Sequence, residues 1–170
     1  MSLPKLISDT TEKLLQHQLG IEYQAATTYL AMSNICDVLG IFGCKKYFLA
    51  QSVEEMSHYQ KVADFLLDRN AVPQVPQILA VDPTQWTDLR TILYAYYNHE
   101  ILVENSWKKV AQVVRIQEKD DLVYTFSQEF LKEQLQEVST VIDLISTFET
   151  LSLGGNIGYA TGRLDEIMGK

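Results

Sequence analysis

The stretch that decides the fold is QSVEEMSHYQK, residues 51–61, in which Glu55 and His58 stand three residues apart. On a helix this spacing places a carboxylate and an imidazole on one face, where both can bind a single metal ion. Phe48 and Val62 lie one heptad to either side of Glu55, so this face is expected to point into a hydrophobic core. Because Glu-x-x-His occurs by chance in many helices, other segments must supply further ligands.

Three other segments carry a polar residue where the helical repeat calls for a hydrophobic one. Glu22 and Glu100 each interrupt an apolar stripe, and a further segment carries Gln134 and Glu137. The two stripes consist of Leu15, Leu19, Ala26, Tyr29 and Met32, and of Leu93, Tyr96, Val103, Trp107 and Val110. A cluster of buried carboxylates is costly unless cations neutralise it. Four carboxylates balance two divalent metal ions.

The composition agrees with cationic ligands. The chain has 170 residues, a formal charge of −8 and a pI near 4.8, which argues against nucleic acid or an anionic membrane as the main partner. The longest apolar runs are shorter than a membrane span, and the first residues lack the apolar core of a signal peptide, so we expect a cytoplasmic protein. Cys36 and Cys44 are too few for a zinc cluster and are expected to be reduced packing residues.

Start and stop signals predict an all-α chain that forms one domain, residues 1–170, with helices at about 8–38, 42–69, 88–116, 119–151 and 157–168. The turn near Gly40 is short, which makes the first two helices antiparallel neighbours. The connection 70–87 contains Pro73, Pro76 and Pro83 and is long enough to run the length of a bundle. The expected architecture is a four-helix bundle with one long crossover and a short fifth C-terminal helix.

The pattern of acids resembles that of di-iron carboxylate bundles, in which two helices give one Glu each and two give Glu-x-x-His. The last long helix departs from it, because Glu133, Gln134 and Glu137 stand in place of a second Glu-x-x-His. One ion is therefore expected to have an imidazole ligand, while the other has carboxylates and an amide oxygen. The second ion should be held more loosely.

Four segments resemble the ferroxidase-centre segments of non-haem bacterial ferritins: IEYQAATTYLAMS (21–33), QSVEEMSHYQK (51–61), NHE (98–100) and KEQLQE (132–137). The similarity covers nearly the whole chain. It implies a ferritin-like fold, with Glu55 bridging two iron ions, Glu137 near the second ion, and Tyr29 beside the centre as an electron donor. The iron ligands that it implies are Glu22, Glu55, His58, Glu100 and Gln134.

The family often has a third iron site, which the resemblance maps onto Glu54, Glu133 and Glu137. Gln136 stands where such ferritins commonly have another Glu, and this weakens the expectation of a third site. Glu129 replaces an aromatic residue that some relatives carry just before that site. We expect Glu129 to be a solvated helix position.

The resemblance implies an iron-storage ferritin. Such a protein oxidises ferrous iron with dioxygen at a di-iron centre and keeps ferric oxide-hydroxide as a mineral core. It would do so inside a homo-oligomeric cage of roughly two dozen subunits, with the short last helix near a symmetry axis. Haem is not expected.

Three alternatives remain open. A bacterioferritin would bind haem through a residue such as Met56, and a rubrerythrin-like oxidase or peroxidase would act on another substrate; both would be expected to carry a second Glu-x-x-His. A non-catalytic shell subunit would be expected to have lost the inward acids, which are retained. His17 is expected to be a structural residue. His99 is expected to lie behind the metal ligands or at the surface, and neither is expected to bind metal. The tyrosines Tyr94, Tyr96 and Tyr97 are expected to pack in the core.

Overall fold

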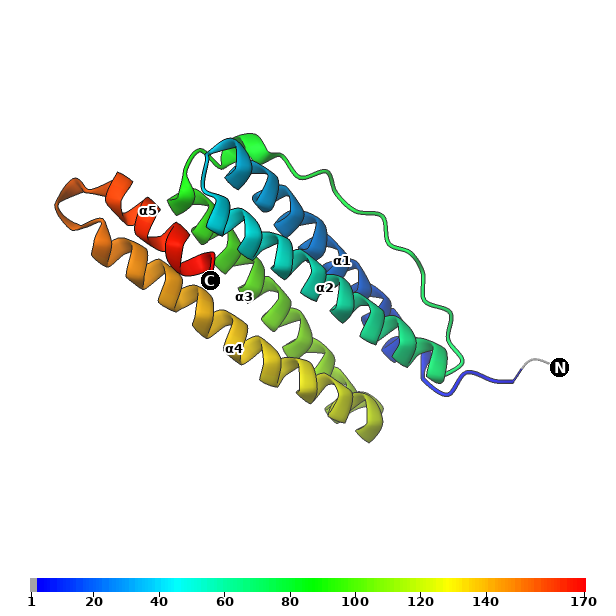
Figure 1. Cartoon of the computed structure of the whole chain (residues 1–170). Helices are drawn as coiled ribbons and strands as arrows, with labels where there is room; N and C mark the ends of the chain where they lie inside the picture. The colour runs from blue at the N-terminus through cyan, green and yellow to red at the C-terminus, as the bar shows by residue number, and fades with distance from the viewer. Residues whose placement is uncertain (1–2) are drawn as a thin grey trace.

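The computed structural model describes residues 3–170, which contain five α-helices and three short helical turns. The helices are α1 (Asp9–Val38), α2 (Phe42–Asp68), α3 (Leu89–Val113), α4 (Asp121–Leu151) and α5 (Ile157–Met168). The turns are η1 (Pro83–Gln85), η2 (Val114–Glu118) and η3 (Leu153–Gly155). The four long helices form a bundle, and α5 lies at one end of it against α2 and α4 (Figure 1). The all-α class, the crossover and the fifth helix are as the sequence predicted.

Three of the long helices begin at a local side-chain cap. Ser8 accepts a hydrogen bond from the backbone of Thr11, and Asp88 and Thr91 form a capping box at the start of α3. Asp120 accepts from the backbone amides of Leu122 and Val123, the second and third residues of α4. These caps fix where the helices start, and therefore which residues face the interior.

The end of α3 differs from the prediction. We expected this helix to reach Ile116, but α-helical hydrogen bonding stops at Val113 and the wider π-helix η2 follows. Lys119 then takes a left-handed conformation with φ 51°, so α4 starts at Asp121 rather than at 119. A π-turn has no Gly or Pro signature, which is why the pattern of residues did not reveal it.

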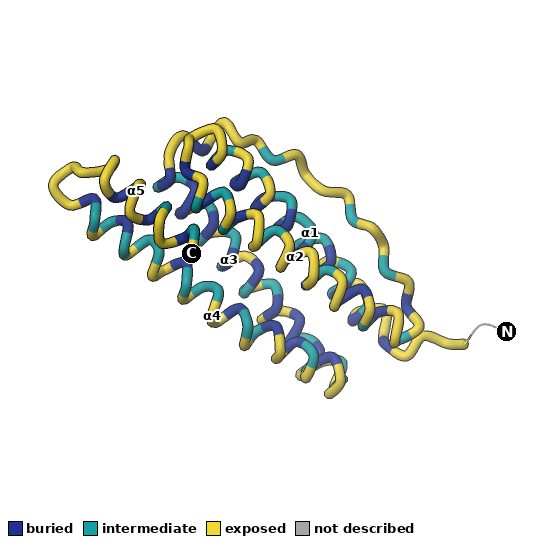
Figure 2. Tube along the Cα trace, in the orientation of Figure 1, coloured by how far each residue is buried: buried dark blue, intermediate teal, exposed yellow. Residues whose placement is uncertain are grey.

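The crossover runs along α1 and connects one end of the bundle to the other (Figure 1). Two glutamines of α1 hold it. The Gln16 side chain donates to the carbonyl of Val72 (2.8 Å) and accepts from the backbone amide of Gln74 (2.9 Å). Gln24 makes the same two bonds with the backbone of Leu79, at 3.2 and 2.8 Å. Each side-chain amide thus satisfies a peptide group of a connection that is otherwise largely exposed (Figure 2).

The inward faces of the helices are buried (Figure 2), and they form two hydrophobic clusters. One includes Phe48 and Tyr96, and the other includes Leu66 and Trp107. Cys36 and Cys44 are free and buried, as packing residues should be. No helix in the described part of the chain is long and apolar enough to cross a membrane.

Helix α5 docks against the first turn of α2, which lacks a side-chain cap of its own. Asp165 supplies the missing acceptor, because its Oδ1 takes a hydrogen bond of 2.8 Å from the backbone amide of Cys44. Lys46 Nζ also donates to the carbonyl of Gly169 (3.0 Å). Gly43 lies so close to α5 that an added Cβ would be 1.9 Å from the carbonyl oxygen of Asp165. The contact therefore depends on the absence of a side chain at this position.

Candidate metal centre

The polar residues that interrupt the apolar stripes come together in the middle of the bundle, with contributions from all four long helices. Glu22 and Glu100 are fully buried, and Glu55, His58 and Gln134 are 2–3% exposed. Glu137 is half-buried. Helical periodicity directs these side chains inward, so the same pattern that builds the core also builds the polar centre.

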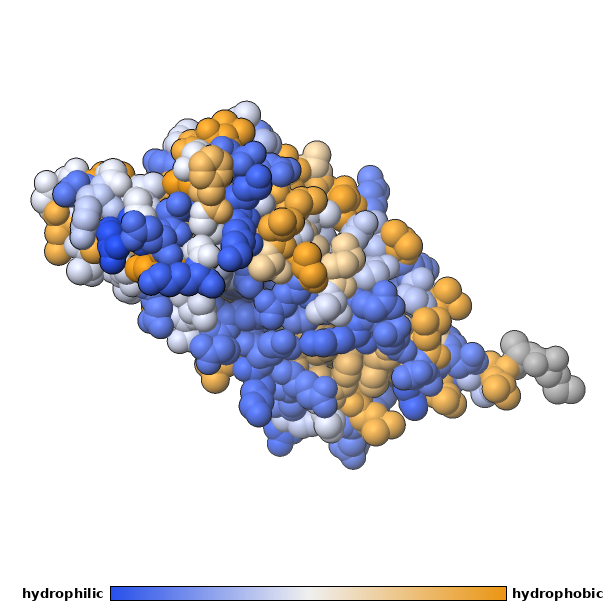
Figure 3. Space-filling view, viewed as in Figure 1, coloured by the Kyte–Doolittle hydropathy of each residue, from blue (hydrophilic) through white to orange (hydrophobic). Residues whose placement is uncertain are grey.

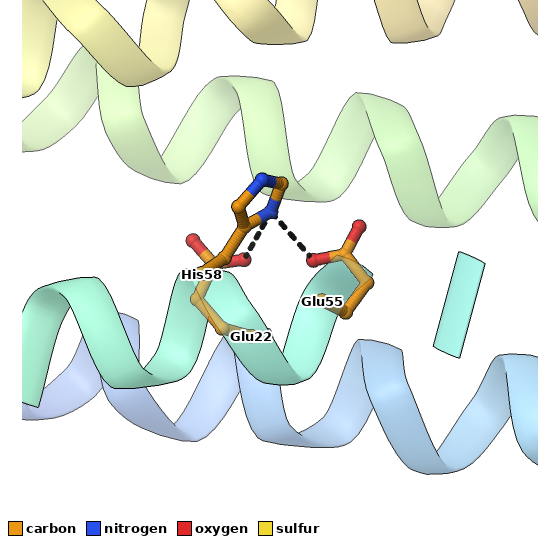
Figure 4. Close-up of side chains that lie close together, drawn as sticks. All are labelled: Glu22, Glu55 and His58. Carbon is orange, nitrogen blue, oxygen red and sulfur yellow. Dashed lines mark hydrogen bonds and ion pairs between the residues drawn. The ribbon is translucent and has the colours of Figure 1, made fainter. Parts of the chain in front are cut away.

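The first group of possible ligands consists of Glu22 from α1 and Glu55 and His58 from α2 (Figure 4). His58 Nδ1 lies 3.1 Å from Glu55 Oε2 and 4.0 Å from Glu22 Oε2. One atom from each residue lies within 4.8 Å of the others, a spacing that one cation can bridge. Carboxylate oxygen and imidazole nitrogen together suit first-row transition metals.

A second group adjoins the first. Glu55, Glu100 and Glu137 each offer a carboxylate oxygen within the same 4.8 Å limit. Glu55 therefore belongs to both groups, as a carboxylate that bridges two ions must. The side-chain amide of Gln134 donates to Glu100 Oε2, and the Tyr29 hydroxyl donates to Glu100 Oε1 at 2.5 Å. These two neighbours fix the orientation of the Glu100 carboxylate.

A third group lies toward the surface and differs from the one that the resemblance implied. It consists of Glu54, which is exposed, Glu133, which is half-buried, and His58, and their ligand atoms lie within 4.8 Å of one another. His58 Nε2 is 3.4 Å from Glu133 Oε1. Glu137, which the resemblance placed both near the second ion and in this group, lies in the second group, and Gln136 is exposed.

Two residues behind the centre were not foreseen as part of it. Gln18 Nε2 and Trp107 Nε1 both donate to Glu22 Oε1, each at 2.8 Å. Gln18 stands one helical turn before Glu22 on the same face, and this spacing was the available signal. The Trp107 indole gave no such signal, because a large aromatic residue in an apolar stripe is expected only to pack in the hydrophobic core.

Several polar atoms of the centre are buried without a hydrogen-bond partner among the described residues. They are Glu22 Oε2, His58 Nε2 and Glu137 Oε2. An unsatisfied buried polar atom costs about 1–3 kcal/mol, and three in one place are unusual in a folded protein. A cation would satisfy the oxygens and the nitrogen alike. The donor set therefore fits metal ions.

The other histidines lie away from the ligand atoms. His17 is exposed. The His99 ring packs against Tyr29 with ring centroids 5.5 Å apart, and burial lowers the pKa of His99 to about 4. Tyr96 is buried and donates to Gln51 Oε1 at 2.5 Å, but Tyr94 is 45% exposed, so the prediction that this tyrosine lies in the core is wrong.

Burial makes the acids of the centre hold their protons more tightly. It raises the pKa of Glu22 to about 8, and the nearby Glu55 carboxylate adds to the effect. Burial and the Glu100 carboxylate likewise raise the pKa of Glu137 to about 8. The pKa values of Glu55 and Glu100 are raised by burial as well. In the absence of metal, the centre therefore carries protons at neutral pH, and bound cations would displace them.

The metal-free protein is expected to lose stability as the pH rises from about 5 to about 8. The folded-state pKa of Glu22, about 8, lies above the ordinary value of 4.5, so the folded state binds the proton more tightly. This contribution is fully present below the ordinary pKa and is lost as the pH rises through the folded-state value. Glu22→Gln should flatten the pH dependence of the thermal midpoint measured in chelator. The exposed Glu166→Gln should not, and equal slopes in both variants would contradict the assignment.

Comparisons with known proteins show the family to which this fold belongs. Residues 12–151 match the model of the Ferritin-like domain family. A probable bacterial non-heme ferritin-like protein of Haemophilus influenzae is 27% identical over 146 residues, which cover 83% of this chain and 86% of that protein. Ferritin BfrB of Mycolicibacterium smegmatis is 32% identical over 134 residues, covering 78% of this chain and 72% of that protein.

Among solved structures, an open-pore ferritin of the hyperthermophilic archaeon Archaeoglobus fulgidus has the same fold. It superposes with a TM-score of 0.89, over 96% of this chain and 98% of that one, at 24% sequence identity. The family match spans most of the chain and includes every residue of the polar centre and the four long helices except the first three residues of α1. The chain therefore belongs to the ferritin family, and its relatives place it with the bacterial non-haem ferritins.

Proposed function

We propose that this protein is an iron-storage ferritin that oxidises ferrous iron with dioxygen and keeps the ferric product inside an assembly of many copies. The observation that carries the proposal is that two groups of three possible ligands share Glu55. Membership of the ferritin family supports iron storage, and the two adjoining groups support oxidation at a pair of ions.

The pairing matters because of the electron count. Each ferrous ion gives up one electron, so two ions held side by side can deliver two electrons to one dioxygen molecule. The ions become more positively charged during this step, and the surrounding carboxylates stabilise the added positive charge. In this proposal Glu22, Glu55 and His58 hold one ion, while Glu55, Glu100 and Glu137 hold the other, with Gln134 beside it.

Tyr29 is proposed as an electron donor to the centre. Its hydroxyl donates to Glu100 Oε1, so the phenol can pass its proton to this carboxylate when an electron leaves the ring. Burial raises the pKa of Tyr29 well above its ordinary value. The residue therefore stays protonated until oxidation, and proton and electron leave together.

The group formed by Glu54, His58 Nε2 and Glu133 is proposed as a third, weaker ion site. Two of its members are at least partly solvent-exposed, and water competes there for the ion. The three sites together would lead from the interior of the bundle toward the surface.

The test is to add ferrous iron in air to the purified metal-free protein at two ions per chain. We expect a rapid rise in ferric absorbance, oxygen uptake of one dioxygen per two ions, and elution of the iron with a large assembly on size-exclusion chromatography. Repeated additions should be oxidised in turn, as storage requires; a permanent di-iron cofactor would react once and keep its ions. Oxidation no faster than in buffer, or a monomer that retains no iron, would refute the proposal.

A further inference from the structure

A groove of about 350 Å³ lies between α2 and α4, beside the third group of possible ligands. The backbones of these two helices stay apart, because α2 packs on α1 and α4 packs on α3, and side chains such as Phe65 and Phe126 meet across the space between them. Hydrophilic side chains gather between α2 and α4 on this face of the molecule (Figure 3). The polar residues that line the α2–α4 groove are Lys61, Asp64, Asp68, Glu129 and Glu133.

The inner end of the groove adjoins the metal centre, because Glu133 and Phe130 line the groove and lie against His58. The Nδ1 atom of this ring faces Glu55 and Glu22, and its Nε2 atom faces Glu133, which lines the groove. His58 is only 3% exposed, and its Nε2 atom has no hydrogen-bond partner in residues 3–170. Phe130 lies against the same ring and also lines the groove. An unpartnered ligand atom is thus directed from the buried centre toward a groove lined with acids.

Lys61 lies where the groove meets this group, and it is the one basic residue among those that line the groove. Its ammonium is 3.5 Å from Glu133 Oε2, while Glu133 Oε1 faces His58. One carboxylate is therefore shared between the lysine and the possible ion site. The ammonium and a divalent ion at Glu133 would compete for the same acceptor and repel each other.

We propose that the α2–α4 groove is a path for divalent cations to and from the metal centre, and that Lys61 gates this path by competing with the cation for Glu133. The inference rests on the proposed function, since it concerns the traffic of its ions. Asp64, Asp68 and Glu129 attract hydrated cations to the groove, and Glu133 passes them to His58 and Glu54.

The Lys61–Glu133 ion pair that forms this gate can break at a small cost in free energy. The side chains of Lys61 and Glu133 are 51% and 39% exposed, and an ion pair of this kind is worth at most about 1 kcal/mol. Asp64 stands one helical turn after Lys61 on the same face of α2, so the displaced ammonium has another carboxylate within reach. Lys61 thus weakens the third site without closing it, and an ion there remains exchangeable.

The test uses Co²⁺, whose absorption reports binding without iron chemistry. The assembled, metal-free protein is titrated as wild type, Lys61→Gln, Lys61→Arg and Lys108→Gln. We expect two tight ions per chain in every form and a third, weaker ion that Lys61→Gln binds roughly fivefold more tightly, the effect of losing an exposed ion pair. Lys61→Arg should behave like wild type. Lys108, which pairs with Glu104 elsewhere on the surface, is the matched control.

The path itself is tested by the rate of loading. Glu129→Gln removes one charge from the groove without touching the proposed ligands, so Co²⁺ uptake at low salt should slow about twofold or more while the final stoichiometry stays the same. If wild type and Lys61→Gln bound the third ion with equal affinity, Lys61 would not compete with the cation for Glu133. If Glu129→Gln took up Co²⁺ at the wild-type rate, the groove would not be the path of the cations. In both cases the two tight ions would leave the proposed function standing, whereas their absence from wild type would refute that function and the path with it.

Discussion

Replacing Glu55 with alanine is expected to slow the first phase of ferrous oxidation by at least about tenfold while the protein stays folded and assembled. Glu55 belongs to both groups of ligands, so its loss deprives both proposed ions at once. The fold should survive, because burial and the nearby Glu100 carboxylate make Glu55 costly to ionise in the absence of metal, and removing this acid removes that cost. Stopped-flow absorbance after mixing with two ferrous ions per chain gives the rate.

The matched control is the next residue, Met56, which is 40% exposed on the outer side of the same helix. Met56→Ala should oxidise iron at the wild-type rate and should have the same assembly state. Co²⁺ titration of Glu55→Ala should also show loss of tight binding. A wild-type oxidation rate in Glu55→Ala would mean that the shared carboxylate is not part of the reaction.

Replacing Gly43 with alanine is expected to undock α5 and lower the melting temperature by several degrees. The new Cβ would meet the backbone oxygen of Asp165 at 1.9 Å, and backbone cannot yield as the end of a flexible side chain can. Overpacking of this kind costs about 1–3 kcal/mol, and loss of the Asp165 cap on Cys44 adds about 1 kcal/mol.

Gly162→Ala provides the control, because Gly162 lies inside α5 and a Cβ there would meet no atom within 4 Å. That change should be neutral or should stabilise the helix by up to about 1 kcal/mol. Circular dichroism gives the melting temperatures, and limited proteolysis reports whether the C-terminal segment has become accessible. Equal melting temperatures for Gly43→Ala and wild type would show that the close contact is not needed for docking.

The sequence predicted what depends on periodicity and local signals. The order of the helices, the crossover and the inward position of Glu22 and Glu100 all follow from the spacing of apolar residues and from turn residues. Boundaries marked by a cap, as at Ser8 and Asp88, fell within a residue of the expected positions. Family resemblance then turned a set of buried acids into a hypothesis about a metal centre.

What the sequence could not predict depends on contacts between distant residues. Nothing local to Asp165 marks it as the cap of another helix, because the bond to Cys44 joins residues 121 positions apart. The sequence also left Glu137 both near the second ion and in the third group, and it is the packing of α4 on α3 that brings its carboxylate beside Glu55 and Glu100. Such features are decided by how the helices pack on one another.

The helix contacts also have a consequence for the order in which the chain folds. Most of the interhelical contacts are between α1 and α2 and between α3 and α4, each pair being joined by a short connection, so each pair is a local hairpin that can form early. The late step is the docking of the two hairpins, and this step brings the acids together. An ion held by Glu22, Glu55 and His58 touches the first hairpin alone, whereas an ion held by Glu55, Glu100 and Glu137 joins the two. The second ion is thus the one whose binding would drive the final assembly of the bundle.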